Sequence, residues 1–195
     1  MSRSGDGYHH GNLREALERG AMALLETQPA NEISLREVAR AAGVSHNAPY
    51  HHFGDRKALL KVLAERSMAA LLESNRAAGG VGDPVERLRR IGHDYVRFAA
   101  ERPHAFAVIY DPAVCVPGQP TDTMAPLIAA EEQLVGDVVR DVLGEDADGA
   151  AIEALAAASW GVAHGLAQLA QAGHLTLEQA LAAVDAFVDR AVPAR

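Results

Sequence analysis

The sequence predicts an all-α protein, and three observations lead to that prediction. The 195-residue chain is 49% hydrophobic but only 5% aromatic. Alanine, which loses no side-chain entropy in a helix, supplies much of the apolar content. No segment alternates between apolar and polar residues with the period of two that a β-strand requires, and helix-start signals recur along the chain. We therefore expect a succession of helices.

The N-terminal part carries signals for four helices. Ser34 and Glu37 form a capping box that starts the second helix, and Gly43 ends it in a left-handed conformation. Ser45 is the expected N-cap of the third helix, and Asp55 is that of the fourth. The predicted ranges are 13–27, 35–42, 46–52 and 56–77.

The C-terminal part carries start and stop signals of its own. Asp83 and Pro84 start a helix that Pro103 ends. Thr176 and Gln179 form a second capping box ahead of the last helix. The predicted helices cover residues 84–101, 104–110, 126–143, 149–172 and 177–192.

Composition excludes several classes of protein. The single cysteine, Cys115, rules out an intrachain disulfide framework and a cysteine-rich zinc module. A redox sensor and an incidental loop cysteine are the two interpretations of it. No apolar run reaches membrane-spanning length, and residues 1–11 lack the apolar core of a signal peptide. We expect a soluble cytoplasmic protein that makes no membrane contact.

Charge is divided unevenly along the chain, whose formal net charge is −8. Residues 1–66 carry nine Lys or Arg against eight Asp or Glu, a balance of +1, and five of the nine histidines. Residues 67–195 carry nine Lys or Arg against eighteen Asp or Glu, a balance of −9. This division indicates an N-terminal part that can meet a polyanion and an acidic remainder that stays away from it.

Residues 35–52 have the pattern of a helix-turn-helix motif. Ala39 is small enough to let two helices approach, Gly43 supplies the positive φ of the turn, and Val44 is an apolar plug between the helices. The second helix directs polar side chains outward, and such a face can enter the major groove of DNA and contact base edges. Helical proteins that bind no DNA also contain such pairs.

Residues 34–60 read SLREVARAAGVSHNAPYHHFGDRKALL and resemble the DNA-binding signature of the TetR-type transcriptional regulators. The match joins the motif to its Tyr-x-His-Phe ending, residues 50–53, and to the start of the next helix. It departs from the common pattern at Ala48-Pro49, where many members have Thr-Leu, and at Arg56, where lysine is usual. Residues 8–14, with Trp160, His164 and Gly165, resemble a subgroup that has a tryptophan–histidine–glycine pattern in its effector domain.

The resemblance implies roles for nine residues. Ser34, Arg36 and the Tyr50 hydroxyl are expected at DNA phosphates, and Arg56 implies an anion site at the next helix N-terminus. Asn47 is the best candidate for a bidentate contact to adenine. An exposed polar surface is the alternative for these side chains. The residues expected to face the groove are Ser45, His46, Asn47, Ala48 and His51.

The resemblance further implies a helix-turn-helix DNA-binding domain over residues 1–60, with the long helix to about 78 as a connector, and a ligand-binding and dimerisation domain over residues 83–195. Six residues are expected to line an effector cavity, and ordinary core packing is the alternative for them. They are Tyr95, Phe98, Phe106, Tyr110, Trp160 and His164. The expected dimer interface comprises Leu166, Leu169, Leu181, Val184 and Val188.

We accordingly expect a homodimeric transcriptional regulator, most simply a repressor, that binds a palindromic DNA operator and a small-molecule effector. No enzyme activity, cofactor or metal is expected, and His9 and His10 are assigned to a terminal arm that binds no metal. One alternative is a dimerisation or protein-interaction module without an effector. The other is an all-α enzyme that uses His164 with Ser159 or Asp94, although no catalytic motif accompanies them.

Overall fold

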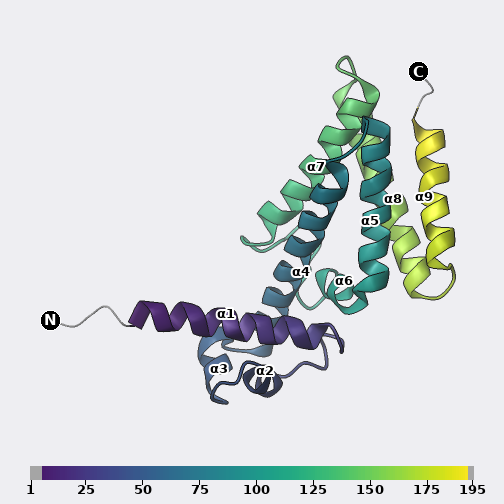
Figure 1. Ribbon diagram of the computed structural model, residues 1–195. Coiled ribbons are helices and arrows are strands. Elements are labelled where there is room, and N and C mark those ends of the chain that lie inside the picture. Colours follow the sequence, from purple (N-terminus) through teal and green to yellow (C-terminus); the bar gives the residue numbers. More distant parts are fainter. Residues whose placement is uncertain (1–5, 193–195) are drawn as a thin grey trace. The chain divides into compact units, whose positions relative to one another are not determined.

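The computed structural model describes residues 6–192, with side chains from residue 13 onward. Every regular element in this range is an α-helix, which confirms the predicted all-α fold (Figure 1). None of the helices in the described part is long and apolar enough to cross a membrane. The helices are α1 (Asp6–Leu25), α2 (Leu35–Ala41), α3 (Ala48–Phe53), α4 (Arg56–Gly79), α5 (Pro84–Glu101), α6 (Pro103–Ile109), α7 (Ala125–Leu143), α8 (Gly149–Gln171) and α9 (Leu177–Ala191).

Helix starts carry the side-chain caps that the sequence predicted. At α2, Ser34 Oγ accepts the Glu37 N–H at 3.2 Å, and the Glu37 carboxylate accepts the Ser34 N–H at 2.9 Å. The same pair of bonds starts α9 at Thr176. Asp55 and Asp83 cap α4 and α5 by accepting backbone N–H groups. These bonds pair amides that have no partner within a helix.

The start of α3 corrects one prediction. The helix begins at Ala48, two residues later than expected, and Asn47 rather than Ser45 holds the N-cap position. Pro49 explains the shift, because a proline fits the first helical turn, where its missing N–H leaves no helical bond unmade. The Ser45 carbonyl instead accepts the Ala48 N–H at 3.0 Å, in the turn before the helix.

The start of α1 is the second difference. It begins at Asp6, ahead of the expected residue 13, so the backbone of His9 and His10 is helical. The side chains of these two histidines, assigned above to a terminal arm, lie outside the described residues.

The chain divides into two compact units. The N-terminal unit contains residues 1–67 and 104–120, and the C-terminal unit contains residues 68–103 and 121–195. Residues 104–120, which include all of α6 except its first residue, Pro103, therefore cluster with the helix-turn-helix part, although the sequence placed them in the second domain. Helix α4 contributes residues to both units.

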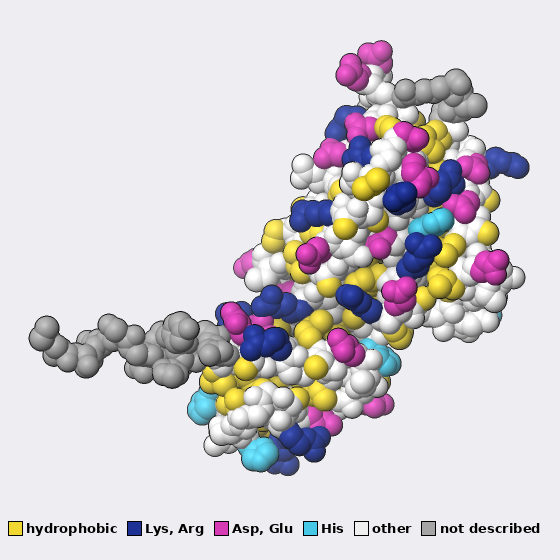
Figure 2. All heavy atoms as spheres, viewed as in Figure 1, with side chains coloured by type: hydrophobic (Ala, Val, Ile, Leu, Met, Phe, Trp, Pro, Cys, Tyr) yellow, Lys and Arg dark blue, Asp and Glu magenta, His cyan; other side chains and the backbone are white. Residues whose placement is uncertain are grey.

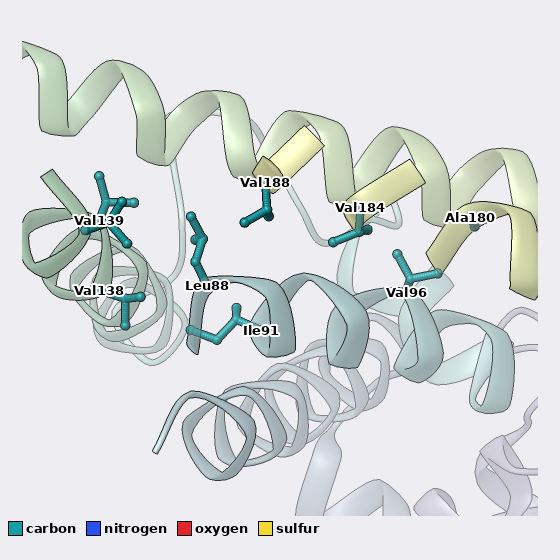
Figure 3. Packing of buried hydrophobic residues seen from close by; sticks show 9 residues of the cluster. Leu88, Ile91, Val96, Val138, Val139, Ala180, Val184 and Val188 are labelled. Atoms are coloured by element: carbon teal, nitrogen blue, oxygen red, sulfur yellow. The ribbon is translucent and has the colours of Figure 1, made fainter. Parts of the chain in front are cut away.

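In the C-terminal unit, α5 is packed by α7, α8 and α9. Figure 3 shows Val184 and Val188 of α9 directed toward α5, where Leu88 and Val96 lie. A Cβ atom at Gly92 of α5 would lie 2.8 Å from Val184 Cγ1, so the missing side chain permits this close approach. Helix α9 thus contributes to the core of its own chain.

That packing corrects the predicted dimer interface. Val184 and Val188 are only 3% and 2% exposed, because they fill the core between α5 and α9. Leu166 and Leu181 are half-buried against the same core, and Leu169 alone among the five predicted residues is exposed. The prediction assigned the apolar stripe of α9 to a partner chain, whereas α5 of the same chain covers it.

Candidate functional site

Helices α2 and α3 form a rigid support for the turn between them. Val38 and Ala39 of α2 are fully buried, and Gly43 has a φ of +66°, a conformation that glycine adopts without steric cost. Helix α1 also approaches α2 closely, since a Cβ atom at Gly20 would lie 3.2 Å from the Ala42 nitrogen. The turn and α3 are therefore held from beneath by buried apolar contacts.

An exposed polar surface lies on the other side of this support. We call it the recognition surface and define it as Ser45, His46, Asn47, Tyr50 and His51, all of which are exposed. Tyr50 is 47% exposed, and the Asn47 side chain makes no capping bond to the helix. The Asn47 side chain therefore has no capping role, and the five side chains are accessible to a partner.

Ala48 does not belong to the recognition surface. It was expected to face the groove, but it is 9% exposed and packs in the core together with Pro49. The structure places this position in the core rather than on the outer face of α3. The predicted groove contact through the Ala48 methyl group is therefore corrected.

Positive charge surrounds the recognition surface. Residues 34–57 contain four Lys or Arg against two Asp or Glu, a balance of +2, although the whole chain is acidic. Arg36, Arg40 and Lys57 are exposed. Figure 2 shows Lys, Arg and His side chains together at the edge of the molecule formed by α2 and α3. Ser34, the other residue predicted at a phosphate, is occupied by the capping box of α2.

Arg56 has partners that the sequence did not predict. Its guanidinium donates to the carbonyls of Ile33 and Ala30, at 3.5 and 3.4 Å, and to the carbonyl of Asn31. These carbonyls belong to the loop between α1 and α2. Arg56 therefore fastens this loop to the start of α4, and its place at a DNA phosphate stays a prediction.

Glu18 is a buried charge that the sequence analysis missed. It is 4% exposed, and its carboxylate accepts from Arg14 Nε at 2.8 Å and from Arg66 Nε at 2.9 Å. His52 Nε2 of α3 lies 3.8 Å from the same carboxylate. Burial acts to raise the pKa of Glu18, but the bonds from the two arginines outweigh it and lower the pKa. Glu18 thus ties α1 to α4 through one ionised group, and the His52 ring of α3 lies near it.

The residues predicted to line an effector cavity fall into separate groups. In the C-terminal unit, Tyr95 Oη lies 2.9 Å from His164 Nδ1, and the rings of His164 and Trp160 are 5.7 Å apart. Tyr95 is buried, whereas Trp160 is 53% exposed. Burial lowers the pKa of His164, so its neutral form is favoured. Phe98 is also buried, with the Arg102 guanidinium 5.4 Å from its ring centre.

The other two predicted residues pair with each other in the N-terminal unit. The rings of Phe106 and Tyr110 are 5.3 Å apart, and Phe106 is fully buried. Core packing accounts for Phe106 without a ligand. The Tyr95–His164–Trp160 group is the polar part of the predicted set, and it stays a candidate for ligand contact.

Helix α8 exposes an apolar face. Ala154, Ala157, Ala158 and Gly161 are exposed, and Glu153 is the one Asp, Glu, Lys or Arg residue of the helix. A Cβ atom at Gly161 or at Gly165 would meet nothing within 4 Å, so packing inside the chain does not require glycine at either position. The face is small, weakly charged and uncovered, which suits close approach of another helix.

Ser159 and Asp94, which the enzyme alternative combines with His164, have other hydrogen-bond partners. Ser159 Oγ donates to the Leu155 carbonyl at 2.8 Å, and Asp94 accepts from Ser74 Oγ at 3.0 Å. Neither bond joins His164, whose Nδ1 faces Tyr95. Among the described side chains, no group of three or more His, Cys, Asp or Glu is placed to hold a metal ion.

Two family descriptions match the sequence. Residues 88–194, more than half of the chain, match the family described as "Tetracyclin repressor-like, C-terminal domain". Residues 19–63, which contain the helix-turn-helix, match "Bacterial regulatory proteins, tetR family".

Solved structures resemble the whole chain. A protein of unknown function from Rhodococcus sp. RHA1 is 31% identical with a TM-score of 0.78, over 96% of this chain and 97% of that one. A tetR-family transcriptional regulator from Streptomyces coelicolor is 22% identical with a TM-score of 0.69, over 90% and 78% of the two chains. At that identity the second likeness shows the fold alone.

Curated relatives match shorter stretches. The HTH-type transcriptional regulator AcrR of Shigella flexneri is 38% identical over 73 residues, which are 36% of this chain and 34% of that protein. The nucleoid occlusion factor SlmA of Vibrio campbellii is 31% identical over 94 residues, 47% of this chain and 48% of that protein. The chain thus matches between about a third and a half of the length of these relatives.

Proposed function

This chain belongs to the TetR family of bacterial regulatory proteins, and from that premise we propose that it is a homodimeric, ligand-responsive transcriptional repressor. It would act in the cytoplasm on a palindromic DNA operator. The recognition surface is the observation that carries the proposal. Its five side chains are exposed, polar and supported by a buried frame, and exposed arginines lie beside it. Direct base contacts need donors and acceptors presented in this way.

Two copies of the surface are needed for a palindrome. In a symmetric dimer the two α3 helices would lie about 34–36 Å apart, or at a related spacing, and would enter successive major grooves on one side of the duplex. Arg36 and Arg40 would then contact phosphates, which position the protein without contributing sequence information.

We place the dimer contact on α8 rather than on the buried stripe of α9. The exposed face with Ala157, Gly161 and Leu169 supports this, because small residues let two helices pack closely and the face has almost no charge to desolvate. Val184 and Val188 would contribute to dimerisation indirectly, by holding α9 and α8 in place.

An effector would control the repressor by binding two dimer conformations unequally. A ligand shifts such an equilibrium only by its difference in affinity for the two states. Residues 67–195 have a charge balance of −9, which weakens non-specific attraction between the protein and DNA. This acidic balance supports release of the operator when the effector binds. Trp160, His164 and Gly165 support assignment to the tryptophan–histidine–glycine subgroup.

Selection of bound sites from random duplex DNA tests the proposal. We expect one palindromic sequence to be enriched. Asn47→Ala should then relax base preference at one position of each half-site, by about 1–3 kcal/mol of discrimination. Asn31→Ala is the matched control, since it removes another exposed asparagine of the same unit that lies outside the recognition surface.

The alternative without an effector is separated by a second measurement. A saturable small molecule that changes operator affinity supports the ligand-responsive repressor, whereas a protein partner with no such molecule supports an interaction module. Failure to enrich any sequence, or unchanged preference in Asn47→Ala, would count against α3 as the element that contacts the bases.

A further inference from the structure

A group of polar side chains lies inside the C-terminal unit, apart from the Tyr95–His164–Trp160 group. On α4, Asn75 Nδ2 donates to Glu131 Oε1 of α7, and Ser74 Oγ donates to Asp94 Oδ1 of α5 at 3.0 Å. We call Asn75, Asp94 and Glu131 the acceptor cluster. Three helices contribute to it, and of its residues only Asp94, in the enzyme alternative, was named from the sequence.

Each member of the acceptor cluster has a buried oxygen without a donor. Asn75 Oδ1, Asp94 Oδ2 and Glu131 Oε2 are inaccessible to solvent and accept no hydrogen bond. Asn75 is 0% exposed, so water outside the protein does not reach its amide. Rotating that amide by a half-turn would not remove the deficit, because it would place an oxygen against Glu131 and leave the nitrogen without an acceptor. A buried acceptor without a donor lowers stability, and such groups are rare in folded proteins.

The surroundings of the cluster are negative. Burial raises the pKa of Glu131, and the charge of Asp94 raises it further, which outweighs the Asn75 bond and the charge of Arg76. Arg76 is exposed and donates no bond to the cluster. Within the described part of the chain, the cluster thus has acceptors and carboxylates in excess, and Arg76, the cation whose charge acts on Glu131, donates no bond to it.

We propose that the acceptor cluster binds a primary ammonium group of an organic ligand. A primary ammonium carries one positive charge and three N–H donors, and carboxylate and amide oxygens that lack a donor are the acceptors such a group needs. A metal ion fits less well, since no group of three or more His, Cys, Asp or Glu in the described part is placed to hold one. An anionic or purely apolar ligand would leave every one of these oxygens without a donor.

This inference rests on the proposed function, because it names the chemical class of the effector. Binding of the ammonium group would supply the missing donors, and its charge would favour the ionised form of Glu131. The ligand would therefore be held through α4, α5 and α7 together, and a change in the packing of these helices would accompany binding.

The test uses the full chain and four small probes that differ in charge and in N–H donors. n-Hexylamine carries the ammonium, tetramethylammonium carries the charge without an N–H, 1-hexanol carries a neutral hydroxyl, and hexanoate carries the opposite charge. Thermal unfolding and calorimetric titration should show concentration-dependent stabilisation by n-hexylamine alone. A response equal in size to 1-hexanol, hexanoate or tetramethylammonium would overturn the proposal, as would no response to the amine.

Isosteric variants locate the site. Glu131→Gln and Asp94→Asn keep the shape of the cluster and the acceptors of its bonds from Asn75 and Ser74 but remove one charge each, and each should weaken n-hexylamine binding at least about tenfold. Glu132→Gln, at the next and exposed position of α7, should bind as the parent does. Equal affinity in all four proteins would overturn the assignment, and so would a crystal structure grown with the amine that shows water alone on the three oxygens.

Operator binding is measured in a separate experiment, so that failure of the ammonium site can be distinguished from failure of the proposed repressor function. Amine binding that depends on Glu131 but leaves operator affinity unchanged would retain the site and remove its role as the effector site. Amine binding by a protein that enriches no DNA sequence would overturn the proposed function and leave the ammonium site standing.

Discussion

Each unit of this protein contains a glutamate that is withdrawn from solvent, Glu18 almost completely and Glu131 in part, and the two glutamates have opposite surroundings. Glu18 in the N-terminal unit accepts from two guanidinium groups, and these bonds lower its pKa in spite of burial. Glu131 in the C-terminal unit accepts from one neutral amide, retains an oxygen without a donor, and has its pKa raised by burial. Both lie on helices, so the difference comes from what the neighbouring helices supply.

The contrast separates a structural charge from one that is available for binding. A buried carboxylate whose oxygens are all paired holds helices together and has nothing left to offer a ligand. A buried carboxylate with an orphaned oxygen weakens the fold, and a ligand that supplies the missing donor can recover that loss. Four predictions break or sharpen this contrast.

The largest effect is expected at Glu18. Glu18→Gln should lower the free energy of unfolding by about 2–3 kcal/mol near neutral pH, below the usual figure for a broken buried pair because Arg14 and Arg66 are more than half exposed and regain water. The pKa of Glu18 is lowered, so its contribution is complete above the ordinary carboxyl pKa and is lost as the pH falls through the lowered value. Urea unfolding over a range of acid pH should show the difference from the parent shrinking.

Glu15 gives the control for that measurement. Its 3.4 Å pair with Arg19 lies on the exposed side of α1. Glu15→Gln should therefore change stability by less than about 0.5 kcal/mol at any pH. An equal loss of stability in the two variants would mean that burial is not the reason for the contribution of Glu18 to stability.

Two glycines with open surroundings provide the second comparison. A Cβ atom at Gly43 in the N-terminal unit or at Gly136 in the C-terminal unit would meet nothing within 4 Å. Gly43→Ala should still lower stability by about 1–2 kcal/mol, because its φ is +66°. Gly136→Ala, inside α7, should raise stability by about 0.5–1 kcal/mol. Chemical denaturation of both variants checks the opposite signs, and two losses would contradict the conformational argument.

The third comparison concerns exposed cations in the two units. Arg36→Ala should weaken binding to all DNA sequences alike and reduce the slope of log affinity against log salt by about one. Arg90→Ala, which removes an exposed arginine of α5, should leave that slope unchanged. Titrations with labelled operator DNA at several salt concentrations give both slopes. An equal change in the two variants would indicate a response to net charge rather than contact through α2.

The smallest effect is expected from Glu131→Gln without a ligand. A carboxyl with a raised pKa destabilises the folded state as the pH rises from the ordinary carboxyl value toward the raised one. The variant, which keeps the acceptor for Asn75, should therefore melt above the parent, and by more in mild alkali than in acid. Glu132→Gln should show no such trend. A lower melting temperature for Glu131→Gln at every pH would place Glu131 with Glu18 among the structural charges.

Local features of the fold could be predicted from the sequence, because short-range physics sets them. The capping boxes at Ser34 and Thr176 and the positive φ of Gly43 depend on residues within four positions of each other. The start of α3 was missed by two residues, since the preference of Pro49 for a first helical turn outweighed the capping potential of Ser45.

Long-range features of the candidate sites could not be predicted in the same way. The bond from Arg66 to Glu18 joins positions 48 apart, and that from Asn75 to Glu131 joins positions 56 apart. An apolar stripe on α9 does not reveal whether α5 or a second chain covers it, because both would bury the same side chains. Gly92 on α5 was the one signal in the sequence for the contact between α5 and α9, because a helix alone does not require glycine at this position.

The packing of Val184 and Val188 against α5 affects how operator occupancy would depend on the amount of protein. Val184 and Val188 fill this part of the core within one chain, so this packing does not depend on a second copy. If the chain pairs as proposed, pairing would be an equilibrium separate from folding, and single folded copies would persist while the protein is scarce. If pairs alone occupy the operator, occupancy would climb with roughly the square of the number of copies, and a gene under this control would switch off over a narrow range of protein levels.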